Sequence, residues 1–308
     1  MIDRIVVVQS AAFTGSTWLC YVLASHERAF SLGNPGIAWD LFQERRAGTC
    51  RIHYQKCEFW KEVDRRNPNA ESFLETIVDV SGCSTLVLYN PRHEPFLSQI
   101  ADGSLAREVV RTRVIRDVRQ RYASWKRRNK DKTVIDTVGG FLTSAKFQKP
   151  SDVDESGIVD LRHELLSTDR NYVVEQAASL TGLKMKDDAV CYWKYNHHPA
   201  AGNGVTHTTC RHFQNPEKQG QELDEVYLRY LEGVEKGTDF RFDDDRWESE
   251  VSEYERFVID VVAGEMNQEN GYERDSFSDE QQAEWGSRLL REGAEAGHDD
   301  WGTEFGIS

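Results

Sequence analysis

A stretch of small residues near the N-terminus, Thr14-Gly15-Ser16-Thr17, has the composition of an anion-binding loop. It follows the apolar run Ile5-Val6-Val7-Val8, which is typical of a strand buried on both faces, and it precedes apolar residues at helical spacing. A loop between a strand and a helix directs backbone N–H groups and the positive end of the helix dipole at an anion. Ser16 and Thr17 add hydroxyl donors, and Gly15 lets the backbone approach a phosphate closely. We therefore expect this loop to bind phosphate.

The loop differs from the Walker A sequence G-x-x-x-x-G-K-[ST]. Ser10 stands at the first glycine position, and Ser16 stands at the lysine position. The lysine that reaches the terminal phosphates of ATP or GTP is therefore missing, and hydrolysis of either nucleotide is not expected. A kinase acting on a small molecule stays open as an alternative, because the expected architecture belongs to the same class.

A second candidate site lies in residues 107–132, which hold eleven Lys or Arg residues and three acidic ones. The pattern from Val109 to Ile115 predicts a strand that leads into a basic helix from about Asp117 to Lys130. Arg116 would then lie at the end of the strand, and Ser124 about two helical turns further on. An arginine fork with a hydroxyl suits a phosphate dianion. The alternative is a solvated basic helix face.

The elements that must position these residues alternate between strand and helix, which favours an α/β fold with a parallel sheet covered on both faces. Further strands are predicted at 84–89 and 158–161, and further helices at 71–80, 96–101, 169–181 and 247–267. We interpret the irregular, aromatic-rich segment 34–69 as helical insertions that form a substrate lid, and the polar segment 131–156 as a mobile connection. One domain is expected over 1–275, followed by a loosely packed acidic tail, 276–308.

The chain of 308 residues has a formal charge of −14, and the negative charge lies in residues 231–308, where 23 acidic against 7 basic residues give −16. An acidic surface opposes general nucleic-acid binding. The acidic end is either solvated or a docking segment for a basic partner. No stretch approaches the roughly 20 apolar residues of a membrane span, and the N-terminus lacks the features of a signal peptide. We expect a cytoplasmic protein without a membrane span.

The cysteines are scattered and form no Cys-x-x-Cys pair; they are Cys20, Cys50, Cys57, Cys83, Cys191 and Cys210. The spacing of Cys50 and Cys57 is not that of a zinc knuckle. We therefore expect reduced, mostly structural thiols and no metal site.

The phosphate loop, in the context Ala12-Phe13-Thr14-Gly15-Ser16-Thr17-Trp18-Leu19, resembles the 5′-phosphosulfate loop of sulfotransferases, roughly P-[KR]-S-G-[ST]-T-W-L. The segment from Arg113 to Ser124 resembles the 3′-phosphate motif of that family, a strand ending in R-D-P-R with a serine eight residues after the first arginine. Val118 replaces the proline of that motif.

Three weaker similarities follow the family's order. Residues 89–93 resemble a K-x-P-x-H turn, residues 160–182 resemble a Y-E-D-L segment with a helix ending in F-L-G, and residues 198–203 resemble an H-x-x-x-G-N turn. The resemblance covers about residues 4–275.

The resemblance implies a P-loop-like sulfotransferase fold and transfer of a sulfuryl group from 3′-phosphoadenosine 5′-phosphosulfate (PAPS) to an acceptor hydroxyl. The second product would be adenosine 3′,5′-bisphosphate (PAP), and no metal is implied. The residues that would bind the nucleotide are Thr14, Gly15, Ser16, Thr17 and Trp18 at the 5′ end, Arg116 and Ser124 at the 3′-phosphate, and Asn203 and Arg211 in the last binding loop. Carbohydrate, lipid, small alcohol and peptide acceptors all suit an aromatic-lined lid.

The sequence departs from the family at two cationic positions. Phe13 stands at the basic position of the phosphosulfate loop, and Tyr89 stands at the lysine of the K-x-P-x-H turn. Loss of one preorganised transition-state donor typically costs on the order of 10²–10³ in rate. The alternative is therefore a catalytically silent nucleotide-binding or interaction protein.

Other residues are candidates for the missing chemistry. Arg92 is the first candidate for a replacement cation, and Arg45 and Arg46 are further ones. His93 is the candidate base, because a histidine with a pKa near 6.5 suits proton abstraction and the resemblance puts a histidine at this turn.

Overall fold

The computed structural model describes residues 1–91, 94–142, 157–214, 228, 231–234 and 246–307. The chain divides into two compact units. Unit 1 consists of Met1–Ser10, Gly15–Val114 and Ser156–Asp243, and unit 2 consists of Ala11–Thr14, Ile115–Glu155 and Asp244–Ser308. Each unit has its own hydrophobic core.

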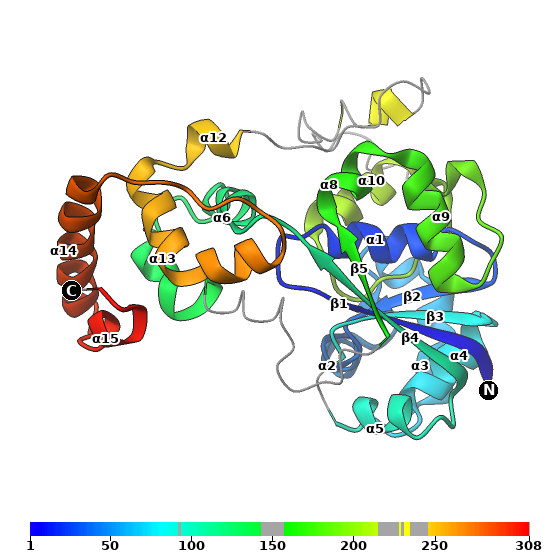
Figure 1. Cartoon of the computed structure of the whole chain (residues 1–308). Coiled ribbons are helices and arrows are strands. Elements are labelled where there is room, and N and C mark those ends of the chain that lie inside the picture. The colour runs from blue at the N-terminus through cyan, green and yellow to red at the C-terminus, as the bar shows by residue number, and fades with distance from the viewer. Residues whose placement is uncertain (92–93, 143–156, 215–227, 229–230, 235–245, 308) are drawn as a thin grey trace. The chain divides into compact units, whose positions relative to one another are not determined.

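Unit 1 is built on a five-stranded sheet with the order β2-β3-β1-β4-β5 (Figure 1). Its strands are β1 (Ile2–Gln9), β2 (Ala29–Gly33), β3 (Thr85–Tyr89), β4 (Ala106–Ile115) and β5 (Ile158–Arg162). The central strand β1 pairs in parallel with β3 and with β4, and β2 pairs in parallel with β3. Ile5, Val6 and Val8 are fully buried, which explains why the apolar run of β1 is continuous rather than alternating.

Helices flank this sheet, so the predicted α/β class is confirmed. They are α1 (Ser16–Leu23), α2 (Pro35–Arg45), α3 (Glu58–Arg66), α4 (Phe73–Ser81), α5 (Phe96–Ala101), α8 (His163–Thr168), α9 (Arg170–Thr181) and α10 (Gly204–Gln214). Short 3₁₀ turns are η1 (Arg46–Thr49), η2 (Tyr54–Lys56), η5 (Asp187–Val190) and η6 (Tyr192–Lys194). In Figure 1, α1 and α9 lie on one side of the sheet and α4 on the other. The predicted lid segment, residues 34–69, contains α2, η1, η2 and α3, so it is helical over much of its length.

Ser10 ties the ends of three strands together at the carboxyl edge of the sheet. Its carbonyl accepts hydrogen bonds from the Tyr89 hydroxyl (3.1 Å) and from Asn90 Nδ2 (2.7 Å), and its hydroxyl accepts one from Val114 N (3.0 Å). The chain leaves β1 toward β2 on one side and later crosses to β4 on the other. Such a divergence of crossovers is where open α/β sheets bind ligands, so the segments after β1 and β4 are the place to look for a site.

Unit 2 is helical in the residues that the structure describes. It contains α6 (Val118–Lys126), α7 (Ile135–Thr137), a π-helical turn η3 (Val138–Leu142), α12 (Trp247–Glu250), α13 (Glu253–Glu269), α14 (Asp279–Glu295) and α15 (Trp301–Phe305). Ser252 and Ser278 begin α13 and α14 with capping boxes, in which each serine side chain and the residue three positions on satisfy each other's backbone N–H groups. The predicted mobile connection, residues 131–156, includes α7 and η3, so part of it is helical. Its residues 143–156 lie outside the described residues.

The prediction of a loosely packed C-terminal tail is wrong. Residues 279–305 form α14 and α15, and Leu289 and Trp301 are buried in the core of unit 2. A side chain on Gly293 would meet the Trp301 ring, because an added Cβ would lie 2.5 Å from Trp301 Cε3. The glycine content that suggested an open chain instead allows a helix to pack closely against an aromatic ring.

Within the described residues, no helix combines the length and the apolar character that crossing a membrane requires.

Candidate functional site

The predicted phosphate loop lies between β1 and α1 with two residues at positive φ. Gly15 has φ 84° at the N-cap of α1, a conformation that a residue with a Cβ adopts only at a cost. Phe13 has φ 66°, which is rare for a bulky side chain. The Thr14 hydroxyl donates to Ala11 O (3.0 Å), so Thr14 braces the turn from inside. The loop therefore has a defined, partly strained conformation of the kind found at binding sites.

His163 contacts the loop at Gly15. An added Cβ on Gly15 would lie 3.3 Å from His163 Cδ2 and 3.5 Å from His163 Nε2. His163 is the first residue of α8, and its side chain is buried. The sequence placed His163 in a family-like segment without assigning it a role. Its position directly after the predicted strand at 158–161 is the signal that could have pointed to the loop.

The turn before α10 contacts the other end of the loop. Asn203 N donates to Thr17 Oγ1 (3.3 Å), and an added Cβ on Gly202 would lie 2.9 Å from Thr17 Cγ2. Ser16 and Trp18 are buried beside Thr17 in the first turn of α1. Ser16, Thr17, Trp18 and Asn203 thus share one neighbourhood of unit 1.

Two further arginines lie close to this turn. Burial, together with the charges of Arg211 and Arg51, lowers the pKa of His207 to about 4, and His207 Nε2 lies 3.0 Å from an added Cβ on Gly202. The Arg211 guanidinium donates to the Tyr54 hydroxyl and to Thr208 Oγ1 (2.7 Å). His207 is therefore neutral near pH 7, and the positive charge beside the turn comes from the arginines. Arg51 was not singled out from the sequence.

Arg116 and Ser124, which the sequence assigned to one phosphate, are brought together in unit 2. Arg116 Nη1 lies 3.4 Å from Ser124 Oγ and donates to Phe13 O (2.8 Å), while Nε donates to Gln120 Oε1 (3.2 Å). Arg116 is 6% exposed. The two side chains therefore lie close together, with Arg116 two residues before the start of α6 and Ser124 within that helix.

The basic segment is more than a solvated helix face. Arg121 is fully buried and its Nε donates to Ala12 O (3.1 Å), so a second arginine holds a carbonyl before the loop. Arg127 Nη2 donates to Ser124 Oγ (3.2 Å) and Nη1 pairs with Glu250 (2.5 Å). Several cations therefore surround Ser124 and the start of the loop, which favours an anion site.

The two departures from the family pattern have structural partners of their own. The Phe13 ring packs edge-on against Phe141, with centroids 5.7 Å apart, and the guanidinium of Arg128 lies 5.3 Å from the Phe13 ring centroid. Tyr89 binds the Ser10 carbonyl. Neither residue supplies charge, but Arg128 brings a cation to position 13.

The predicted catalytic residues Arg92 and His93 lie outside the described residues. Arg45 is exposed at the end of α2. Arg46 donates to Asn67 Oδ1 (3.3 Å) and lies 5.1 Å from the Phe42 ring centroid, so its guanidinium is engaged within the lid segment itself.

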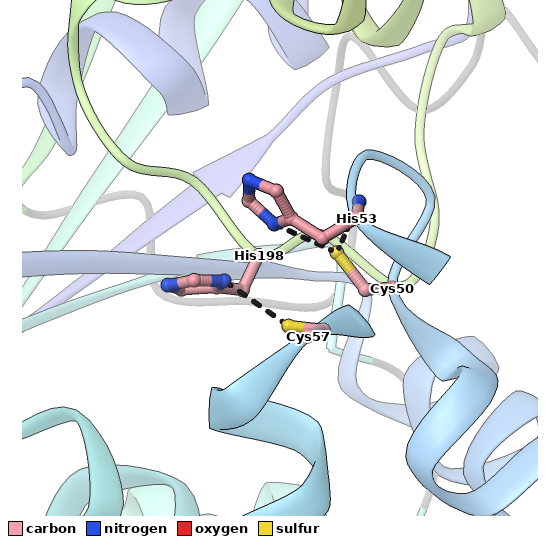
Figure 2. Close-up of side chains that lie close together, drawn as sticks. All are labelled: Cys50, His53, Cys57 and His198. Carbon is pink, nitrogen blue, oxygen red and sulfur yellow. Dashed lines mark hydrogen bonds between the residues drawn. The ribbon is translucent and has the colours of Figure 1, made fainter. Parts of the chain in front are cut away.

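All six cysteines are buried free thiols, and two of them lie beside histidines in a group that could hold a metal ion. The group consists of Cys50, His53, Cys57 and His198 (Figure 2). Spacing alone did not reveal it, because His198 follows Cys57 by 141 positions.

A cavity of about 770 Å³ in unit 1 does not belong to the phosphate loop. It is lined by the segment between α1 and β2, by α3, by the end of α4 and by residues near His198. No residue from Thr14 to Trp18 lines it.

The architecture matches that of a solved sulfotransferase domain. A sulfotransferase domain from the curacin biosynthetic pathway is similar with a TM-score of 0.53 and 14% identity, over 89% of this chain and 99% of that one. The fold is the sulfotransferase fold. A sulfotransferase domain from the Synechococcus PCC 7002 olefin synthase is similar with a TM-score of 0.46 and 12% identity, over 77% of this chain and 94% of that one. No family model and no curated protein matches the chain.

Proposed function

We propose that this chain is a sulfotransferase that moves a sulfuryl group from PAPS to an acceptor hydroxyl. One observation carries the proposal: Arg116 contacts both the Ser124 hydroxyl and the carbonyl of Phe13 in the loop. A buried guanidinium beside a hydroxyl fits the 3′-phosphate that distinguishes PAPS from ATP. The same guanidinium also holds the carbonyl of Phe13, the residue directly before Thr14.

The 5′-phosphosulfate would bind at the first turn of α1. There the N–H groups of the helix N-terminus and the hydroxyls of Ser16 and Thr17 favour an anion, and Gly15 offers no side chain that would block it. Asn203 N donates to Thr17 Oγ1 and fixes the orientation of that hydroxyl.

Sulfuryl transfer breaks the bond from sulfur to the bridging phosphate oxygen and forms a bond from sulfur to the acceptor oxygen, whose proton passes to a base. We assign the base to His93 and the cation that compensates the leaving phosphate to Arg128, with Arg92 as the alternative cation. Arg128 lies beside Phe13, which stands where the family carries its basic residue. The acceptor would be a carbohydrate, a lipid, a small alcohol or a peptide.

Calorimetric titration with PAP and with 5′-AMP, which lacks the 3′-phosphate, tests the nucleotide assignment. Wild type should prefer PAP, and Arg116→Ala should lose that preference at a cost of about 3 kcal/mol, roughly 150-fold in affinity. Arg107→Ala is the matched control, because Arg107 lies in β4, the strand that ends directly before Arg116, and its exposed side chain pairs with Asp3 at 3.6 Å. Equal affinity of wild type for PAP and 5′-AMP would overturn the assignment.

Incubation with sulfur-labelled PAPS and a panel of the four acceptor classes tests the reaction. His93→Gln should lower kcat, with His163→Gln as the comparison at the loop. Transfer that His163→Gln abolishes and His93→Gln leaves intact would move the base to His163.

A catalytically silent nucleotide-binding protein is the second candidate, and Phe13 and Tyr89 favour it. Micromolar binding of PAP with no labelled product from any acceptor would support it, and clear turnover would end it. Tighter binding of ATP than of PAP, with phosphorylated product, would instead favour a small-molecule kinase.

A further inference from the structure

Four side chains of unit 1 gather two sulfur and two nitrogen atoms in one place. They come from two distant segments: Cys50, His53 and Cys57 flank the short turn η2, and His198 lies between η6 and α10. The potential ligand atoms all lie within 4.8 Å of one another. Cys50 and Cys57 are buried, whereas His53 and His198 are half-buried. A group of this kind is the donor set of a tetrahedral Cys₂His₂ metal site.

The measured distances fit one metal ion. Cys50 Sγ lies 3.5 Å from His53 Nδ1, and Cys57 Sγ lies 3.2 Å from His198 Nδ1 (Figure 2). With Zn–S near 2.3 Å and Zn–N near 2.0–2.1 Å, a tetrahedral site separates sulfur from nitrogen by about 3.6 Å. Both histidines direct Nδ1 at the sulfurs, and in Figure 2 their other ring nitrogens point away from the group. The group is therefore close to the size that a zinc ion requires.

The surroundings hold His198 in this position without the metal. Its ring stacks on Phe59 with centroids 5.1 Å apart, and its carbonyl accepts from Trp60 Nε1 (2.9 Å). Arg51 N donates to Pro199 O (2.8 Å), which ties the segment after Cys50 to the residue after His198. Backbone and ring contacts thus pre-organise a ligand from a remote part of the chain, as outer contacts do in metal sites.

The charge of the site is also compatible with burial. His53 N donates to Cys50 Sγ (3.3 Å), and such an N–H···S hydrogen bond stabilises a thiolate. If both thiols release their protons to solvent, two thiolates and two neutral imidazoles balance a divalent cation. A neutral metal centre avoids the cost of an isolated buried charge.

A two-iron cluster with the same ligand types does not fit. In such a cluster the two cysteines hold one iron and the two histidines hold the other, which separates sulfur from nitrogen. Here each histidine nitrogen lies beside a cysteine sulfur. A single ion with mixed ligands is the arrangement that matches, and a mixed sulfur and nitrogen tetrahedron favours zinc.

We propose that a structural zinc ion is bound tetrahedrally by four side chains of unit 1: Cys50, His53, Cys57 and His198. Four protein ligands leave no position open for water or substrate, so the ion is structural rather than catalytic. It joins the lid segment to the segment that precedes the Gly202–Asn203 turn, and that turn contacts Thr17. The proposal does not depend on sulfuryl transfer.

Metal analysis of the full chain, purified without an affinity tag or chelator, tests the site. Wild type should contain one zinc per chain, and Cys57→Ser and His198→Asn should each fall below about 0.1 zinc per chain. Cys83→Ser is the matched control, because Cys83 is a buried thiol outside the group and its loss should leave zinc unchanged. Cobalt exchanged into wild type should give the visible absorption of a tetrahedral thiolate site, which does not require a variant to fold.

Three results would overturn the proposal. Wild type without metal, with both thiols reactive after unfolding, would make the group ordinary buried thiols. An intact mass lower by two hydrogens, restored by reduction, would show a Cys50–Cys57 disulfide. Zinc retained in both ligand variants, or another metal in its place, would refute the assignment of zinc to these side chains.

Discussion

The two units offer an anion different kinds of groups. In unit 1 they are backbone N–H groups and hydroxyls at the start of α1, held by the φ of Gly15 and by the contact of Asn203 with Thr17. In unit 2 they are arginines, of which Arg116 and Arg121 are buried and bind carbonyls of the segment before the loop. Backbone N–H groups have fixed directions, whereas guanidinium groups bind anions through charge-assisted hydrogen bonds. Separate substitutions can therefore test the loop conformation in unit 1 and the charge of the arginines in unit 2.

The largest expected effect tests whether unit 2 is a folded support for its arginines. Trp301→Ala should destabilise unit 2 by about 3–5 kcal/mol, because Trp301 is buried and its loss leaves a cavity. Urea unfolding followed by hydrogen exchange would measure the loss in each unit. Glu304→Ala, an exposed change in the same helix, is the control. An unchanged unfolding midpoint for Trp301→Ala would mean that residues 276–308 contribute nothing to the unit.

The next largest expected effect is a difference between the two units in how their stability falls at acidic pH. His207 in unit 1 has a pKa lowered to about 4 by burial and by the charges of Arg211 and Arg51, so the unfolded chain binds its proton first. The stabilisation of unit 1 that comes from neutral His207 is fully present above about pH 6.5. It falls by on the order of 3 kcal/mol as the pH drops toward 4. Denaturant titrations with hydrogen exchange between pH 7 and 4 would measure the free energy of unfolding of unit 1. His207→Asn should make this free energy depend less steeply on pH.

The acid response of unit 2 should begin at lower pH. Burial raises the pKa of Glu255, but hydrogen bonds from Lys126, Tyr122 and the Ser252 cap outweigh it, and the pKa of Glu255 is lowered overall. Ionised Glu255 therefore stabilises unit 2 above the usual carboxyl pKa, near 4.3. This stabilisation is lost as the pH falls below that value. We expect unit 1 to lose its protection from hydrogen exchange at a higher pH than unit 2. Loss of this protection in unit 2 first, as the pH is lowered, would contradict the expectation.

A smaller effect isolates the backbone of the loop. Gly15→Ala should cost about 1–2 kcal/mol, because alanine resists φ 84° and its Cβ would approach His163. PAP affinity should fall about tenfold in calorimetry. Gly82→Ala is a matched control, since Gly82 has φ 61° with nothing within 4 Å of an added Cβ. Equal loss of PAP affinity in both variants would show a general effect of stability instead.

The smallest expected effect concerns the hydroxyl beside Arg116. Ser124→Ala should weaken PAP by about 1 kcal/mol, roughly fivefold, and should leave 5′-AMP unaffected because the hydroxyl would serve only the 3′-phosphate. Ser249→Ala, an exposed serine of α12, controls for loss of a hydroxyl in unit 2. A parallel loss of both nucleotides would place Ser124 outside the 3′-phosphate site.

Local patterns predicted the elements that carry the phosphate loop and the basic helix. The apolar run of β1, the strand before Arg116 and the helix at 169–181 are encoded by neighbours in the chain, and each lies where it was expected. β2 (Ala29–Gly33) was missed, because no strand was predicted between the phosphate loop and residue 34. That strand is short, and its pairing with β3 is a long-range contact that local spacing does not reveal.

The candidate site was predicted where its spacing is local and missed where its residues come from remote segments. Arg116 and Ser124 are eight positions apart, and their contact lies within one short segment of the chain. His163 beside Gly15 and Arg128 beside Phe13 depend on how distant segments pack. The expectation that no metal is bound stays a prediction, and the group around Cys50 and Cys57 gives reason to test it.

The sequence by itself determined the α/β class and the strand–loop–helix formed by β1 and α1, because periodicity acts within a few residues. The resemblance to the family's 3′-phosphate motif, rather than periodicity, singled out Arg116 together with Ser124. Only the tertiary structure decided that the acidic C-terminal segment packs as α14 and α15, since the burial of Trp301 depends on Gly293 and its neighbours. It also decided that His198 meets Cys57, because proximity across 141 positions is a property of the fold and not of the local chain.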